Sequence, residues 1–151
     1  MAPSTLIIAD NTPEFHEFIR QLRNDDRIQD GFLERVRITP EQQQQYMVRL
    51  GDRYVVALLD GCPAGYAGSI DGDIRVCTHP EAQGKGVAKA LILEIMQRFP
   101  ESQARVKRDN AASQALFEAC GFEHVGIDDG LLVYRLPAES APSTMPADDP
   151  R

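Results

Sequence analysis

The sequence predicts an α+β fold with a single mixed, mostly antiparallel twisted sheet flanked by helices. One observation is that short β-prone runs alternate with amphipathic helical segments along 151 residues, a length that suits one domain. Another is that most neighbouring runs are joined by short turns containing Asp and Gly, which connect antiparallel strands. A parallel sheet would need a longer crossover after each strand.

The N-terminal part of the chain predicts one strand and two helices. The strand is the apolar run "TLIIAD", and the first helix extends from about Thr12 to Asn24. Thr12 and Pro13 form its start signal, which Thr39 and Pro40 repeat in "TPEQQQQYMVRL". The inward face of the first helix consists of Phe15, Phe18, Ile19 and Leu22.

From Tyr54 the apolar pattern changes to that of strands. The runs "YVVALL", "AGYAGSI" and "IRVCT" are separated by turn residues and predict a three-stranded antiparallel meander. A helix follows and ends at Pro100. Its core face consists of Ala88, Leu91, Ile92, Ile95 and Phe99.

The last third predicts a strand, a helix and a hairpin. "QARVKR" is the strand, "NAASQALFEAC" is the helix with Gly121 as its cap, and "FEHVGI" and "LLVYRL" form the hairpin. We expect Ala112, Ala115, Leu116 and Ala119 to face inward. From Pro137 onward the composition shifts to Ala, Ser, Pro and Asp, so residues 1–136 are predicted as the domain and 137–151 as a disordered tail.

Composition narrows the functional classes. The formal net charge of -7 provides no surplus of Lys and Arg, so we expect no nucleic-acid binding. No apolar run approaches the roughly 18 residues that cross a bilayer, so we expect no membrane insertion. The N-terminus lacks a secretory pattern and the three cysteines lack metal-ligand spacing, which favours a reducing cytoplasm and no metal site.

The segment "HPEAQGKGVAKALILEIM" places Gly84 and Gly86 where an amphipathic helix begins. A helix N-terminus has backbone N–H groups without intrahelical partners, and glycine leaves them open to an anion. A P-loop would need Ser or Thr directly after Lys85, and a dinucleotide fingerprint would need a third glycine at Lys89. The segment therefore predicts a phosphate cradle of another kind.

Two motifs in the right order resemble the GNAT superfamily of N-acyltransferases. Gln83–Ala88 is similar to its pyrophosphate motif, Gln/Arg-x-x-Gly-x-Gly/Ala. Asn110 followed by a helix and by Gly121 and Phe122 is similar to its next signature. The resemblance covers roughly Tyr54 to Val125 and implies an acetyl-CoA-dependent N-acetyltransferase that acts on the primary amine of a small molecule.

The resemblance also implies a set of cofactor-binding residues. Backbone groups of the strand before the loop hold the pantetheine arm, N–H groups of the loop bind the pyrophosphate with Lys85 adding charge, and Asn110 contacts the pantetheine or positions the second helix. The amine then attacks the thioester directly. The implied residues are Val76, Cys77, Thr78, Gln83, Gly84, Lys85, Gly86, Val87, Ala88, Asn110, Ser113 and Phe117.

One position departs from the family. Many members carry a Tyr, the donor of a proton to the CoA thiolate, where this chain has Phe117. Ser113, a water or Tyr134 could donate instead, the thiolate could leave unassisted, or the protein could be a non-catalytic acyl-CoA-binding or sensor module. Helical spacing puts Ser113, Phe117 and Cys120 on one face, expected to look toward the cofactor sulfur. No general base is evident.

The acceptor is indicated only by the N-terminal helices. Two short segments resemble the subset of the family that acetylates amino sugars on nucleotide carriers. Other small amines, including polyamines and amino acids, stay open, and so does a protein amine. These segments are Leu22, Arg23, Asn24 and Asp25, followed by Thr39, Pro40 and Glu41. The resemblance also leaves a homodimer through exposed sheet edges open.

Overall fold

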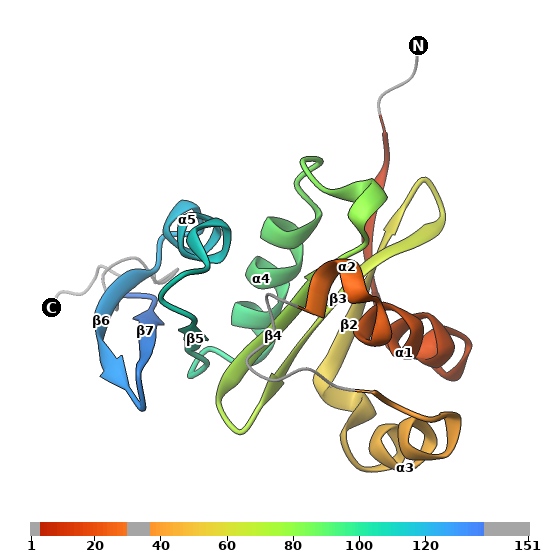
Figure 1. The fold of residues 1–151 in the computed structure, drawn as a ribbon. Helices are drawn as coiled ribbons and strands as arrows, with labels where there is room; N and C mark the ends of the chain where they lie inside the picture. The colour runs from red at the N-terminus through yellow and green to blue at the C-terminus, as the bar shows by residue number, and fades with distance from the viewer. Residues whose placement is uncertain (1–3, 30–36, 138–151) are drawn as a thin grey trace, which may run out of the picture.

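The computed structural model describes residues 4–29 and 37–137, which form two antiparallel sheets flanked by helices (Figure 1). The four-stranded sheet has the order β1 (Leu6–Asp10), β2 (Tyr54–Leu59), β3 (Cys62–Ile70) and β4 (Asp73–Thr78). The three-stranded sheet has the order β5 (Ala104–Val106), β7 (Leu131–Arg135) and β6 (Glu123–Asp128). The expected α+β class is confirmed.

The helices connect the strands in the expected order. The N-terminal helix begins as the 3-10 turn η1 (Pro13–Phe15) and continues as α1. The short helix α2 was not expected from the sequence. The α-helices are α1 (His16–Asn24), α2 (Asp26–Gln29), α3 (Pro40–Leu50), α4 (Val87–Arg98) and α5 (Ala111–Ala119), and two further 3-10 turns are η2 (Gly51–Arg53) and η3 (Pro80–Ala82).

The hairpins follow directly from Asp-Gly pairs in the sequence. At the β3–β4 turn Asp71 has a φ of 53° and Gly72 a φ of 82°, and the β6–β7 turn at Asp129 and Gly130 is similar. Two successive positive φ values define the turn that matches the twist of antiparallel strands. The predicted meander over β2, β3 and β4 and the predicted final hairpin are therefore confirmed.

The expected single sheet is divided because β4 and β5 meet over a very short distance. Their contact is one parallel bridge between Asp73 and Gln103, where the Ile74 N–H donates to the Gln103 carbonyl at 2.8 Å. The Arg105 guanidinium binds the Asp73 carboxylate across the same junction at 2.7 Å. Beyond this bridge and ion pair β4 and β5 separate, and the gap between them is the place of the candidate site.

The core lies on both faces of the four-stranded sheet. On one face α4 buries Leu91, Ile92 and Ile95 completely, and these three residues belong to its predicted core face. On the other face α1 and α3 pack around Tyr54. Gly68 sits under this ring, where a Cβ atom would approach the ring to 2.6 Å, so a larger residue would displace it.

The expected inward face of α5 is wrong for its three alanines, although Leu116 is partly buried and packs against the core as expected. Its alanines are exposed, whereas Phe117 and Cys120 are buried in the core. A phenyl ring removes far more apolar area from water than a methyl group, so its position determines which side of the helix faces inward. Gly121, with a φ of 94°, then turns the chain so that the Phe122 ring packs on Phe117 at 5.3 Å between centroids.

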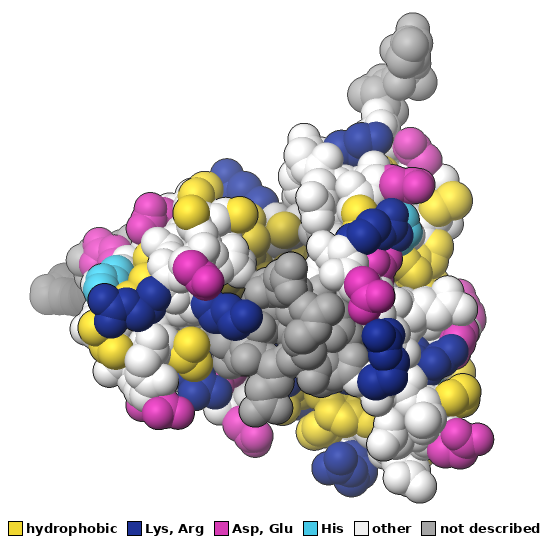
Figure 2. All heavy atoms as spheres, viewed as in Figure 1, with side chains coloured by type: hydrophobic (Ala, Val, Ile, Leu, Met, Phe, Trp, Pro, Cys, Tyr) yellow, Lys and Arg dark blue, Asp and Glu magenta, His cyan; other side chains and the backbone are white. Residues whose placement is uncertain are grey.

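Surface features add little to the functional assignment. Acidic and basic side chains are interspersed over the face shown in Figure 2, so the charge of the site has to be judged from its lining residues. Within residues 4–29 and 37–137, no helix combines the length and the hydropathy needed to cross a membrane. Apart from Pro137, the tail predicted over 137–151 lies outside the described residues.

Candidate active site

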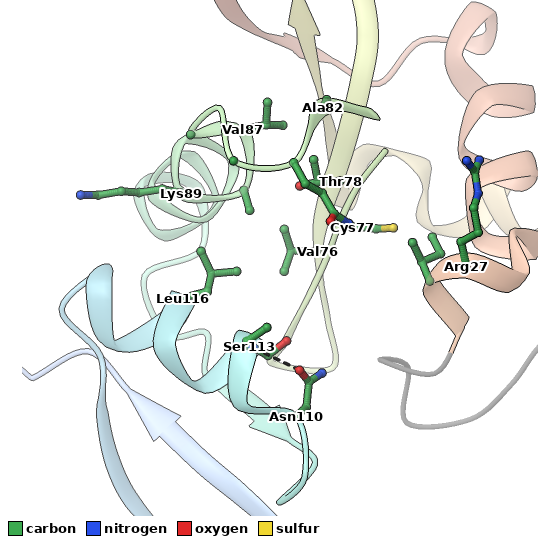
Figure 3. Close-up of a pocket in the computed structure, with 16 residues that line it drawn as sticks. Arg27, Val76, Cys77, Thr78, Ala82, Val87, Lys89, Asn110, Ser113 and Leu116 are labelled. Carbon is green, nitrogen blue, oxygen red and sulfur yellow. Dashed lines mark hydrogen bonds between the residues drawn. The ribbon is translucent and has the colours of Figure 1, made fainter. Parts of the chain in front are cut away.

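A cavity of about 590 Å³ opens where β4 separates from β5 (Figure 3). Its walls come from α2, β4, the glycine loop, the first turn of α4 and the first half of α5. The lining residues are Arg27, Ile28, Val76, Cys77, Thr78, Ala82, Gln83, Gly84, Gly86, Val87, Ala88, Lys89, Asn110, Ala112, Ser113 and Leu116.

The glycine loop forms one end of the cavity with exposed backbone. Gly84 and Gly86 both have a φ of 81°, and a Cβ atom at either position would meet no other atom within 4 Å. No side chain caps the N-terminus of α4, whereas Thr39 caps α3 and Asn110 caps α5. The first N–H groups of α4 are therefore available to an anion.

The free edge of β4 forms the long wall. Because the Ile74 N–H faces β5, and alternate residues of a strand direct their backbone groups to the same edge, Val76 and Thr78 direct theirs into the gap. The Thr78 Oγ1 atom is buried in this wall and has no hydrogen-bond partner among the described residues. An extended amide-containing ligand would find both backbone and side-chain partners here.

Helix α5 forms the opposite wall. The Asn110 side chain accepts a hydrogen bond from the Ser113 N–H at 3.1 Å and so fixes the start of the helix (Figure 3). Ser113 lines the cavity, but Phe117 does not, because its ring is buried in the core. Of the three residues expected on one cofactor-facing side of α5, the structure brings only Ser113 to the cavity.

Tyr134, the second candidate proton donor, lies apart from the cavity. Its ring is buried in the core, and its hydroxyl donates to the Glu118 carboxylate at 3.3 Å. Burial and the neighbouring carboxylate both raise the pKa of this phenol. Tyr134 is absent from the cavity lining, which leaves Ser113 as the better placed of the two candidates.

Cys77 and Arg27 line the other end of the cavity, where the Cys77 side chain points toward α2 (Figure 3). The Arg27 guanidinium is held by Asp25 at 2.6 Å, and this hydrogen-bonded pair lowers the pKa of Asp25 to about 2. Burial raises the pKa of the Cys77 thiol to about 12. The thiol therefore stays protonated at neutral pH and is a poor nucleophile.

His79 lies at the end of β4 beside the glycine loop. Its Nδ1 atom accepts a hydrogen bond from the Glu81 N–H at 3.1 Å. In a neutral imidazole only one nitrogen has a lone pair for a proton, and here that lone pair is occupied. His79 is therefore poorly arranged to act as a general base.

The lining residues carry positive charge only. Arg27 and Lys89 are the charged residues among them, and the lining of the described chain contains no carboxylate. Nor do His, Cys, Asp and Glu side chains gather in a group that could hold a metal ion, as far as the described residues extend. This charge suits an anionic ligand such as a phosphate ester.

The structure brings together all the expected cofactor-binding residues except Lys85 and Phe117, which do not line the cavity. Six lining residues were not anticipated. Ala82 and Lys89 flank the glycine motif and Ala112 and Leu116 belong to the helix after Asn110, so the motifs could have suggested them. Arg27 and Ile28 carry no local signal, because only the fold brings α2 to the end of β4.

Comparisons with known proteins agree with this geometry. The model of the acetyltransferase (GNAT) family matches residues 16–122. No curated protein is significantly similar to this chain in sequence.

Several solved structures share the fold. Spermidine N-acetyltransferase from Vibrio cholerae, in complex with CoA and spermine, is 18% identical, with a TM-score of 0.71 over 85% of this chain and 92% of that one. Phosphinothricin acetyltransferase from Sinorhizobium meliloti, in complex with acetyl-CoA, is 22% identical, with a TM-score of 0.71 over 86% and 85%. Ribosomal-protein-alanine N-acetyltransferase from Brucella melitensis is 22% identical, with a TM-score of 0.65 over 85% and 96%.

The family match covers most of the chain, and the cavity lies at the family's cofactor motifs. This protein belongs to the GNAT family of acetyltransferases, enzymes that take their acyl group from acetyl-CoA.

Proposed function

We propose that this enzyme transfers the acetyl group of acetyl-CoA directly to the primary amine of a small molecule, with both substrates bound together. The observation that carries the proposal is one cavity lined both by the glycine loop at Gly84 and Gly86 and, at its other end, by Arg27 and Cys77. The loop end suits the phosphates of the donor, and the other end is the proposed place of the acceptor.

The residues present fit acetyl-CoA. The uncapped first turn of α4 and the glycine loop offer N–H groups to a pyrophosphate, and the free edge of β4 at Val76 and Thr78 offers partners to the amides of a pantetheine arm. When bound, acetyl-CoA supplies the acetyl group already activated as a thioester. The backbone of β4 then orients the thioester toward the acceptor entry, which favours reaction by positioning.

The chemistry of the cysteines in the described residues supports direct transfer. Cys77 is the cysteine that lines it, and its thiol has a pKa of about 12. Cys120 does not reach the lining. An acetyl-cysteine intermediate would need a thiolate at neutral pH, so neither residue supports one.

Ser113 is the proposed donor of a proton to the departing CoA thiolate. Its hydroxyl lies on the α5 wall one helical turn before Phe117, the position where many family members carry a tyrosine. The Asn110 cap holds this turn in place. Protonation then requires no residue from the buried core.

An amino sugar on a nucleotide carrier is the proposed acceptor. The two segments that resemble enzymes for such substrates are held side by side through Ile38, the residue before Thr39. The Asn24 amide donates to the Ile38 carbonyl at 2.9 Å and accepts from the Ile38 N–H at 2.8 Å. Arg27, in the helix that follows the first segment, lines the cavity wall. Asp25 binds its Nε and Nη2 atoms, so a nucleotide phosphate would bind through Nη1.

Acetyl-CoA-dependent thiol release with a panel of amines tests this function. The panel contains amino-sugar nucleotides, free amino sugars, polyamines and amino acids. We expect the highest kcat/KM with an amino-sugar nucleotide, and a lower value for the same amino sugar without its phosphates. A preference for a polyamine would contradict the acceptor, whereas CoA binding without release on any amine would favour a non-catalytic binding module.

A further inference from the structure

Lys89 is a cation in the cavity wall that has no anionic partner within residues 4–29 and 37–137. The protein has 23 acidic residues against 16 Lys and Arg, and the other charged lining residue, Arg27, is paired with Asp25. Among the described residues no carboxylate forms an ion pair or hydrogen bond with the Lys89 ammonium. A lysine unpaired in such an acidic chain is available to an anionic ligand.

The direction of Lys89 separates it from the pyrophosphate cradle. It is the third residue of α4, and its side chain extends away from Val76 and Thr78, toward the outside of the cavity (Figure 3). Cys120, at the end of α5, lies close enough for the Lys89 charge to oppose the burial that raises the pKa of its thiol. The ammonium is therefore on the α5 side of α4, beyond the glycine loop.

The pyrophosphate does not need this lysine. Backbone N–H groups of the glycine loop and the positive end of the α4 dipole already face that group. CoA carries one further phosphate, on the 3′ position of its ribose, and a phosphate monoester has a charge of about -1.5 to -2 at neutral pH. The positive charge of Lys89, just outside the glycine loop, suits the negative charge of this phosphate monoester.

We propose that Lys89 binds the ribose 3′-phosphate of CoA and makes the enzyme discriminate against 3′-dephospho-CoA. This inference rests on the proposed function, because it assumes that CoA occupies the cavity. It assigns Lys89 a role in cofactor specificity and not in the chemical step. A flexible lysine is suited to this task, since it acts as a point charge and needs no bidentate geometry.

Calorimetric titration of the wild-type protein with CoA and with 3′-dephospho-CoA provides the test. We expect CoA to bind about threefold to tenfold more tightly, as for a partly exposed ion pair with a phosphate. Lys89→Gln should weaken CoA binding by that factor and leave 3′-dephospho-CoA binding unchanged. Lys89→Arg should keep the preference, because the charge remains.

Arg49→Gln is the matched control, since it removes one positive charge from the exposed face of α3, away from the cavity. It should keep the preference for CoA. Equal binding of the two ligands by the wild-type protein would overturn the inference, and so would equal weakening of both by Lys89→Gln, which would assign the lysine to the pyrophosphate. Failure of the wild-type protein to bind either ligand would instead contradict the proposed function.

Discussion

At the scale of single residues, the hydroxyl of Thr78 is the most informative polar group. It is buried in the cavity wall and finds no hydrogen-bond partner in the part of the chain that the structure describes, although buried polar atoms are nearly always paired. The sequence located Thr78 as a backbone contact, but it could not show that the hydroxyl would lack a partner. Such a group lowers the stability of the protein without ligand and is ready to bind one.

Thr78→Val should therefore raise the free energy of unfolding by about 1 kcal/mol, because an isosteric methyl group replaces the unpaired hydroxyl. Denaturant unfolding without ligand measures this. The control Thr78→Ser keeps the hydroxyl and loses a methyl group, so it should be less stable than wild type. A Thr78→Val protein less stable than wild type would mean that the hydroxyl already has a partner in solution.

Ser113→Ala should lower kcat by up to about 10²-fold, the lower end of general-acid contributions, with a smaller change in KM for acetyl-CoA. Tyr134→Phe is the control, because its hydroxyl binds Glu118 and does not line the cavity. Steady-state kinetics of both variants decide the assignment. Should Tyr134→Phe reduce kcat more than Ser113→Ala, the proton donor would be the tyrosine.

At the scale of elements, the sequence predicted those whose signals are local. The β2–β3–β4 meander followed from Asp-Gly turns, and α4 from its apolar face and its glycine start. The buried face of α5 was predicted wrongly for the alanines, because the apolar stripe of three alanines and Leu116 was given more weight than the larger ring of Phe117. Helix α2 escaped prediction because its four residues are too few for a periodic pattern.

The start of α4 allows a sharp test of the anion cradle. Gly86→Ala places a Cβ at a φ of 81°, which costs roughly 1–2 kcal/mol of stability and disturbs the N–H groups that face the ligand. We expect a lower Tm and at least a tenfold weaker binding of acetyl-CoA, measured by titration.

Gly130→Ala provides the matched control for that variant. Gly130 has a φ of 78° in the β6–β7 turn, and a Cβ there would also meet no atom within 4 Å. Its loss of stability should be similar, with acetyl-CoA binding unchanged. If both variants bound acetyl-CoA like the wild type, the backbone of the loop would not be the cradle.

At the scale of the whole molecule, the decisive feature is the separation of the two sheets. No local sequence pattern predicts this separation, because it depends on how α4, α5 and the Asp73–Arg105 ion pair pack where the two sheets meet. The motifs predicted most of the residues that line the cavity at the glycine loop and at the start of α5. The proposed acceptor side comes from α2 and the end of β4, which are distant in sequence, so Arg27 and Ile28 could not be foreseen.

The charge of the whole cavity predicts the pH dependence of the reaction. Its described lining has no carboxylate, and the Cys77 thiol, with a pKa of about 12, does not titrate near neutrality. The amine must lose its proton before attack, so kcat/KM should rise with pH and level off at the pKa of the acceptor. Acceptors of lower pKa should level off at lower pH.

Measurement of kcat/KM against pH for a series of amines checks this behaviour. The inflection should move with the pKa of each amine. An inflection fixed at one pH for every amine would indicate a general base in the enzyme, and would contradict a cavity without one.

The most direct test of the account follows an isotopically labelled acetyl group from acetyl-CoA, with mass spectrometry of the intact protein and of the small molecules. With acetyl-CoA alone the protein should remain unlabelled, because transfer does not pass through Cys77 or any other side chain. With the acceptor added, the label should appear on its amine in step with the release of CoA. A label on the protein that is then passed to the amine would contradict direct transfer, and so would no transfer to any amine.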